Sequence, residues 1–287
     1  MSFRDHTEIV FAAGELLSAA MLEESYRYPR EFLQLYHAAS PDGIIRGLDF
    51  VSREDGVYLT AGIVKLRGIY YTMPWDISLG EWISEQKEPL LEGAEYFFCI
   101  KQEEVMTSEN DAHGIAARGR IALKALRDRP EGALLLGKYK HRADRPLRLP
   151  TLQMGDADPF AEFTQASYVQ LLESEYAHPQ GTTTYHPLLF RAMQSFLEQK
   201  KTLSPYDFSL LTALQNNGIV ALRTLLSYVA ASREVSPASL QMNREKLFHE
   251  VTVCLTKPYQ PAVYHEAPVA EAQEVRRLTR GNKLIDD

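Results

Sequence analysis

The sequence predicts an α+β fold in which an N-terminal antiparallel β-sandwich or barrel is followed by a C-terminal helical bundle. Short apolar runs separated by turn residues fill residues 41–145, whereas apolar residues recur every three or four positions after Phe160. The 287 residues suffice for two ordinary domains. We therefore expect an N-terminal arm (1–40), a β-sandwich domain (41–145), a linker (146–159), a helical bundle domain (160–256) and a flexible tail (257–287).

The N-terminal arm has a mixed apolar pattern that Pro29 interrupts. This pattern predicts an extended start, a short helix near Gly14 to Ser25, and then an arm packed onto the rest of the protein.

The β half is predicted from turn chemistry. Glycine can take the positive φ that tight turns and bulges need. It punctuates the chain at Pro41-Asp42-Gly43, Glu54-Asp55-Gly56, Ala61-Gly62 and Arg67-Gly68. The aromatic run Tyr96 to Ile100 suits a strand, residues 121–126 and 133–139 look like a hairpin, and the polar stretch 103–119 is expected to be an exposed loop. No helical pattern separates these runs, which favours an antiparallel sheet over a parallel α/β sheet.

The helical half is predicted from periodicity and capping residues. Phe160 to Tyr176 is a candidate first helix, and a second begins at Pro187. Ser204, Pro205 and Asp207 together predict the start of a helix. This helix should end at Asn216-Asn217-Gly218. Further helices are expected over Ile219 to Ala231 and from Ser236-Pro237 to about Leu255.

Composition restricts the partners and the compartment. The net charge of −7 is not the excess of positive charge that is typical of proteins that bind nucleic acid, so nucleic acid is not an expected partner. The two cysteines, Cys99 and Cys254, lie in apolar runs, so we expect two buried thiols in a reducing compartment and no disulfide framework. The start of the chain lacks a secretory signal, and no window approaches 18 uninterrupted apolar residues, so a cytoplasmic protein without membrane insertion is expected.

No catalytic or metal-binding motif stands out, and we predict no catalytic residue, no metal and no cofactor. His178 and His186 are separated by a loop, and their spacing does not match a zinc-binding helix. Asp156 and Asp158 precede Pro159, where turn chemistry is the simpler interpretation than cation binding. The sequence has no serine-nucleophile elbow, and its glycines match no phosphate-binding signature.

The aromatic residues of the first third suggest protein contacts. Core packing accounts for most of them, but Tyr and Trp are also enriched where subunits meet. Tyr70, Tyr71, Trp75 and Trp82 are the predicted interface residues.

A stretch of about thirty residues carries a resemblance. The run Asp42-Gly43-Ile44-Ile45-Arg46-Gly47-Leu48-Asp49-Phe50, followed by the strand-like residues 56–71, resembles a glycine-punctuated pattern in phage tail and baseplate proteins. The order of a β-sandwich and then a helical bundle is also similar to the baseplate adaptor of type VI secretion systems, whose N-terminal part is related to the shoulder of phage receptor-binding proteins. A C-terminal receptor-contacting β domain is not evident in this sequence.

The resemblance implies a non-enzymatic structural or adaptor component of a phage-tail-like baseplate, in the cytoplasm or in an injection-machine particle. Its partners would be other protein subunits, and such adaptors are usually trimers. Two alternatives remain open. One is a hydrolase in which His178, His186, Asp156 and Asp158 converge at the domain boundary. The other is a small-ligand or carbohydrate-binding module that uses Trp75 and Trp82.

Overall fold

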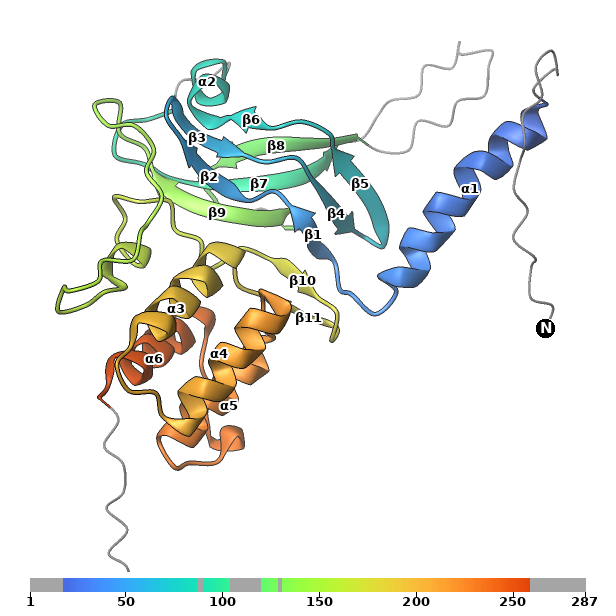
Figure 1. Cartoon of the computed structure of the whole chain (residues 1–287). Coiled ribbons are helices and arrows are strands. Elements are labelled where there is room, and N and C mark those ends of the chain that lie inside the picture. The colour runs from blue at the N-terminus through green and yellow to red at the C-terminus, as the bar shows by residue number, and fades with distance from the viewer. Residues whose placement is uncertain (1–17, 87–89, 104–119, 129–130, 259–287) are drawn as a thin grey trace, which may run out of the picture. The chain divides into compact units, whose positions relative to one another are not determined.

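The computed structural model describes residues 18–86, 90–103, 120–128 and 131–258, and over these residues the protein has the predicted α+β fold (Figure 1). The described strands form three sheets, each with free edge strands. The predicted β-sandwich class is therefore kept, and the alternative of a closed barrel is wrong. The expected extended start, all of the expected loop 103–119 except its first residue, and almost all of the expected tail fall outside the described residues.

The first sheet joins the two halves of the chain. Its strand order is β11-β10-β1-β4-β5. The members are β1 (Gly43–Gly47), β4 (Gly62–Leu66), β5 (Ile69–Met73), β10 (Tyr176–His178) and β11 (Thr182–Thr184). The pair β1–β10 is parallel, with Ile44 opposite Tyr176, and the other pairs are antiparallel. The helix predicted over Phe160 to Tyr176 is therefore wrong, because the chain returns to pair with β1 after a single 3₁₀ turn at Ala161–Phe163.

The second sheet has the order β2-β3-β6, and the third has the order β8-β7-β9. Their strands are β2 (Phe50–Arg53), β3 (Gly56–Leu59), β6 (Ile77–Ser78), β7 (Glu95–Glu103), β8 (Arg120–Leu126) and β9 (Leu134–Lys140). The predicted hairpin of residues 121–126 with 133–139 is wrong, because β7 lies between those strands and pairs with both. Strand β7, which contains the aromatic run Tyr96 to Ile100, takes the central place, and both of its edges are hydrogen-bonded.

Gly47 shows what the glycine-punctuated segment does. Its φ is +68° and that of Leu48 is +53°, so the chain bends sharply between β1 and β2. A Cβ at position 47 would lie 2.0 Å from the carbonyl oxygen of Ala61. Only glycine fits this bend, which sets the start of β2 against the helical half.

Four α-helices follow the first sheet: α3 (Pro187–Gln199), α4 (Pro205–Asn217), α5 (Leu222–Ser232) and α6 (Arg244–Thr256). The predicted starts at Pro187 and Ser204 are confirmed, and Ser204 with Asp207 forms a reciprocal capping box. Gly218, with φ +71°, ends α4 as predicted. The predicted long helix from Ser236 is wrong in its first part, where a 3₁₀ turn at Pro237–Ser239 precedes an Asn243 cap and α6.

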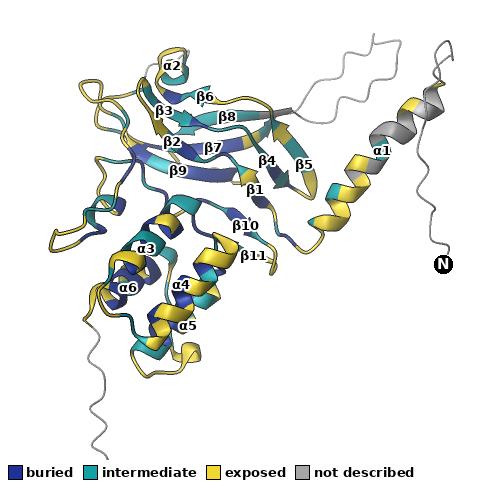
Figure 2. Cartoon of the chain, in the orientation of Figure 1, coloured by how far each residue is buried: buried dark blue, intermediate teal, exposed yellow. Residues whose placement is uncertain are grey.

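One connected core includes side chains from both halves. Phe50 and Phe98 from the strands are fully enclosed, as are Phe190 and Phe248 from the helices, and all four belong to the same cluster. Figure 2 shows buried positions on both the strands and the helices. Cys99 and Cys254 are buried free thiols, as predicted, and burial raises the pKa of Cys99 to about 11. The short helix α2 (Leu79–Ser84) adds Leu79 to this core.

The N-terminal helix differs from the prediction. Helix α1 runs over Ala19–Tyr36 and continues through Pro29. The helix expected near Gly14 to Ser25 is therefore confirmed for the described residues 19–25, but its predicted end and the packed arm after it are wrong. No described helix has the length and apolar content that a membrane crossing requires.

Arg244 ties the last helix to the first sheet. Its guanidinium donates to the carbonyl oxygens of Leu172 (2.9 Å), Ser174 (2.6 Å) and Thr184 (2.6 Å) and lies over the Tyr185 ring. Replacing Arg244 with methionine keeps most of the apolar stem but removes the donors to these three carbonyls. We expect the free energy of unfolding to fall by about 2–4 kcal/mol, since hydrogen bonds from charged groups are the stronger ones.

Urea unfolding of the Arg244→Met variant measures this loss. The variant Arg127→Met, in an exposed turn, is the control and should stay within about 0.5 kcal/mol of the wild type. Equal stabilities of the two variants would mean that Arg244 does not tie α6 to the first sheet.

Candidate functional site

The four residues of the hydrolase hypothesis lie in different environments. Asp156 and Asp158 are exposed just before the 3₁₀ turn at Ala161–Phe163, and Asp158 accepts a hydrogen bond from the Phe160 amide at 3.0 Å. His178 lies on β10 and is half-buried, whereas His186 is completely buried. Within the described part of the chain, no three His, Cys, Asp or Glu side chains are placed to share a metal ion. Of the four, only His186 joins a buried polar cluster.

This buried cluster lies where β1, β2, β10 and α3 meet. The Tyr176 hydroxyl donates to the Asp49 carboxylate at 2.8 Å and contacts the Leu48 carbonyl oxygen at 3.0 Å. The Tyr176 ring packs edge-on against the His186 ring, with centroids 5.0 Å apart. Burial raises the pKa of Asp49, although the Tyr176 hydrogen bond and nearby Arg191 oppose that rise. The hydroxyl and the carboxylate therefore satisfy each other inside the joint between the halves.

His186 caps α3 from inside this cluster. Its Nδ1 lies 3.0 Å from the Leu188 amide, and its Nε2 lies 3.3 Å from the Phe50 amide. A neutral imidazole has one lone pair, so it accepts from one of these amides at a time. Burial and the charge of Arg191 lower the pKa of His186 to about 3. The side chain is thus a neutral structural cap, which gives the buried histidine a role in stability rather than in acid–base chemistry.

The predicted interface aromatics differ in their surroundings. Trp75 follows β5 and is 70% exposed. Trp82, on α2, is partly buried and packs against Phe98, with ring centroids 6.1 Å apart. Tyr71 is also partly buried, and the Tyr70 hydroxyl donates to the His37 carbonyl oxygen at 3.3 Å. Only Trp75 presents most of its surface, so the two tryptophans do not form the paired platform that a carbohydrate-binding module would use.

The two most exposed large apolar residues of the described chain, Leu35 and Tyr36, lie on α1 together with Phe32. Phe32 is 53% exposed, Leu35 78% and Tyr36 73%. With Leu22 and Pro29 they lie on one side of the helix, because residues three, four or seven positions apart share a helix face. The Phe32 and Tyr36 rings stack with centroids 5.8 Å apart. We call Leu22, Pro29, Phe32, Leu35 and Tyr36 the α1 stripe, and Figure 2 shows the exposed residues of this helix.

The C-terminal end of α1 is anchored to the first sheet. Lys65 Nζ donates to the carbonyl oxygens of Ser40 at 2.7 Å and His37 at 3.3 Å, where its charge also suits the helix C-terminus. Tyr70 adds its hydrogen bond to His37. Lys65 and Tyr70 belong to the segment that carries the phage-tail resemblance. That segment therefore fixes the end of the helix that carries the α1 stripe.

Sequence reasoning named Trp75 but missed the α1 stripe. The signal was present in the spacing of Leu22, Pro29, Phe32 and Tyr36. Pro29 was taken as a helix break, although a helix can continue through a proline at the loss of one backbone hydrogen bond.

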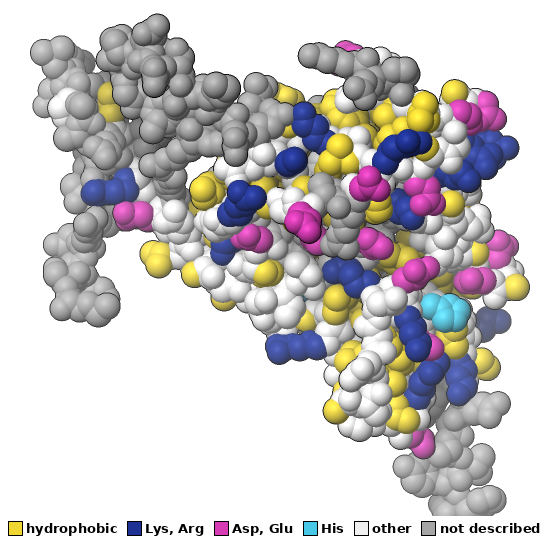
Figure 3. All heavy atoms as spheres, turned by 180° about the vertical axis from the view of Figure 1, so that it is seen from behind, with side chains coloured by type: hydrophobic (Ala, Val, Ile, Leu, Met, Phe, Trp, Pro, Cys, Tyr) yellow, Lys and Arg dark blue, Asp and Glu magenta, His cyan; other side chains and the backbone are white. Residues whose placement is uncertain are grey.

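On the face shown in Figure 3, acidic and basic side chains are interspersed and hydrophobic ones are scattered.

Comparisons with known proteins give a distant likeness. No family model matches the chain, and no curated protein matches it. Among solved structures, the chain is similar to one described as the crystal structure of TssK, with 12% identity, a TM-score of 0.36, and coverage of 88% of this chain and 73% of that chain. It is also similar to a chain of the TssK-TssF-TssG baseplate subcomplex of the type VI secretion system, with 12% identity, a TM-score of 0.32, and coverage of 87% and 97%.

Proposed function

We propose that this chain is a non-enzymatic structural or adaptor component of a phage-tail-like baseplate assembly, and that it acts through contacts with other protein subunits. The observation that carries the proposal is the α1 stripe, a row of large apolar side chains exposed on a helix whose end is anchored to a sheet. Soluble monomers rarely expose contiguous apolar surface, and such patches mark interaction sites.

The energetics of the stripe fit a protein contact. Burying a large apolar side chain contributes about 1.5–3 kcal/mol, so the three most exposed residues together supply a substantial part of a binding energy. Aromatic residues are often among the few residues that carry most of the binding energy of a protein–protein interface. Trp75 provides a second exposed anchor after β5. A specific interface of this kind should bury more than roughly 1,000 Å².

The location of the resemblance supports the assembly context. The residues that resemble phage tail and baseplate proteins form β1 to β5, and two of them, Lys65 and Tyr70, hold the end of α1. In the proposal, these strands are a frame and α1 is the element that reaches a neighbouring subunit. Baseplate partners or further copies of this chain would supply the opposite face.

The variant Phe32→Ser/Leu35→Ser tests the stripe. We expect the incorporation of the chain into tail-like particles to fall about tenfold or more, because the loss of two exposed anchors costs at least about 1.4 kcal/mol of contact energy. The thermal unfolding midpoint should hardly change, since both side chains are exposed. The measurement is the amount of tagged chain per sheath subunit in purified particles.

The control is Glu31→Ser/Gln34→Ser, which places the same two serines at exposed positions of the same helix but outside the stripe. This control should incorporate like the wild type. Absence of the wild-type chain from sheath-containing particles would contradict the proposed function, and equal incorporation of both variants would contradict the role of the stripe.

A further inference from the structure

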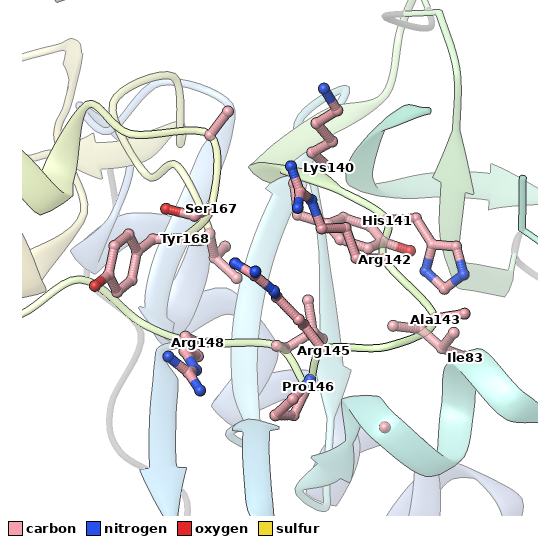
Figure 4. A pocket seen from close by; sticks show the side chains of 15 residues that line it. Ile83, Lys140, His141, Arg142, Ala143, Arg145, Pro146, Arg148, Ser167 and Tyr168 are labelled. Carbon is pink, nitrogen blue, oxygen red and sulfur yellow. The ribbon is translucent and has the colours of Figure 1, made fainter. Parts of the chain in front are cut away.

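A basic hollow of about 320 Å³ lies apart from the α1 stripe. Its walls come from α2, the end of β9, residues 141–148 and residues 166–169. Five of its lining side chains are Lys, Arg or His: Lys140, His141, Arg142, Arg145 and Arg148. Figure 4 shows the guanidinium groups of Arg142 and Arg145 between the segment of Ser167 and Tyr168 and the segment of His141. No acidic residue is among those that line it.

The cations of the hollow are poorly neutralised. Arg145 lies 3.7 Å from Asp144, but both side chains are largely exposed, so that contact is weak. Lys140, Arg142 and Arg148 form no ion pair with any residue in the described ranges. Glu162 is close to Tyr168, whose hydroxyl donates to it at 2.7 Å, but it also accepts from Thr151 and Gln153. In a chain of net charge −7, this local excess of positive charge attracts anions.

The walls of the hollow are held in place by the backbone. The His141 amide donates to Ala94 at 2.8 Å, and the His141 carbonyl oxygen accepts from Gly93 at 2.9 Å. The Ala143 amide donates to the Glu92 carboxylate at 2.7 Å. Glu92 itself does not line the hollow. The Val169 amide donates to the Arg148 carbonyl oxygen at 2.9 Å. A preformed site loses less conformational entropy when it binds a ligand.

We propose that this hollow binds a small organic anion that carries two or more phosphate or carboxylate groups. Its volume falls at the small end of ligand pockets, about 300–1,000 Å³, which favours a small molecule over a protein segment. Arginine forks match phosphate and carboxylate oxygens through paired hydrogen bonds. Ile83, Leu147 and Val169 give the apolar wall that an organic ligand contacts. This site goes beyond the proposed assembly role and does not depend on it.

Calorimetric titration of the full chain with inorganic pyrophosphate and with citrate tests the site. We expect saturable binding of at least one probe, weaker at higher salt because the cations are exposed. In the Arg142→Gln/Arg145→Gln variant, the dissociation constant should rise about tenfold or more, since two charged donors are lost. Binding of pyrophosphate alone identifies a phosphate site, and binding of both probes shows that carboxylates are also accepted.

The matched control is Arg46→Gln/Arg127→Gln, which removes the same charge from two exposed positions outside the lining. Its dissociation constant should stay within about twofold of the wild type, because distant exposed charges are largely screened. No saturable binding of either probe would overturn the proposal, as would an equal loss in the control. Binding of a polyglutamate peptide without binding of either small probe would also overturn it, because the hollow would then be a protein-docking surface.

Discussion

Replacing Asp207 with alanine is expected to lower the free energy of unfolding by about 3–5 kcal/mol, the range for breaking a buried ion pair by removing one partner. Asp207 is 2% exposed and accepts hydrogen bonds from Lys200 Nζ at 2.9 Å, the Tyr228 hydroxyl at 2.7 Å and the Ser204 amide at 2.9 Å. Without the carboxylate, these three donors lose their shared acceptor. Lys200 keeps one contact, to the Leu255 carbonyl oxygen at 2.8 Å.

The charge of Asp207 is part of this network. Burial alone would raise its pKa, but the hydrogen bonds from Lys200, Tyr228 and Ser204 outweigh burial and lower the pKa. The stabilisation is therefore present above the unfolded-state pKa, near 4, and is lost as the pH falls through the lower folded-state pKa. At neutral pH the full effect of the substitution should be measurable.

Denaturant unfolding at pH 7 measures the effect of Asp207→Ala. The variant Asp207→Asn, of the same size but without charge, should lose less because its amide oxygen still accepts a hydrogen bond. Glu198→Ala is the control, since Glu198 is exposed and its two hydrogen bonds come from Gln194 and Gln215. A loss below about 1 kcal/mol for Asp207→Ala would show that the network does not hold α3, α4 and α5 together.

Acidification is expected to destabilise the protein through His186. The ordinary histidine pKa of 6.5 falls to about 3 in the folded state because the ring is buried and close to Arg191. Between about pH 6.5 and pH 3, His186 therefore binds a proton in the unfolded chain but stays neutral in the folded chain. Stability is complete above pH 6.5 and is lost as the pH falls towards 3, at about 1.4 kcal/mol per unit. Between pH 7 and pH 5 the loss from this group is about 2 kcal/mol.

The variant His186→Asn isolates this contribution. Asparagine is a good helix cap and does not titrate, so α3 keeps an acceptor for the Leu188 amide. His37 and His178 also have lowered pKa values, but they are present in both proteins. Unfolding at pH 7 and pH 5 should show about 2 kcal/mol less pH dependence in the variant. The same pH dependence in both proteins would mean that His186 is protonated in the fold.

Local chemistry determined which elements could be predicted from the sequence. The Ser204 cap, Pro187 at the first turn and Gly218 at the helix end are local signals, and all three predicted boundaries are confirmed. The α+β class followed from the change in apolar spacing. Strand order depends on distant partners, so the position of β7 between β8 and β9 was not visible in the local pattern. The return of residues 176–178 to β1 was missed for the same reason.

The candidate sites were harder to predict because they depend on exposure. The sequence identified Trp75 and His186 as residues of interest, but it could not show that one is exposed and the other enclosed. The predicted linker carries Leu149, which is buried, and Arg148, which lines the basic hollow. Arg142 and Arg145 precede it in a segment that appeared only charged and rich in proline. The position of this segment depends on hydrogen bonds with residues 92–94, which are distant in the sequence.

The contact made by α1 can be measured directly with a photo-crosslinking amino acid at position 35, the most exposed site of the α1 stripe. Position 34 is the control, since it is exposed on the same helix but lies outside the stripe, about 100° around the helix axis from position 35. We predict a crosslink from position 35, in assembled particles, to an identified baseplate subunit or a second copy of this chain. Particles that contain the chain but yield equal crosslinks from both positions, or none from position 35, would contradict it.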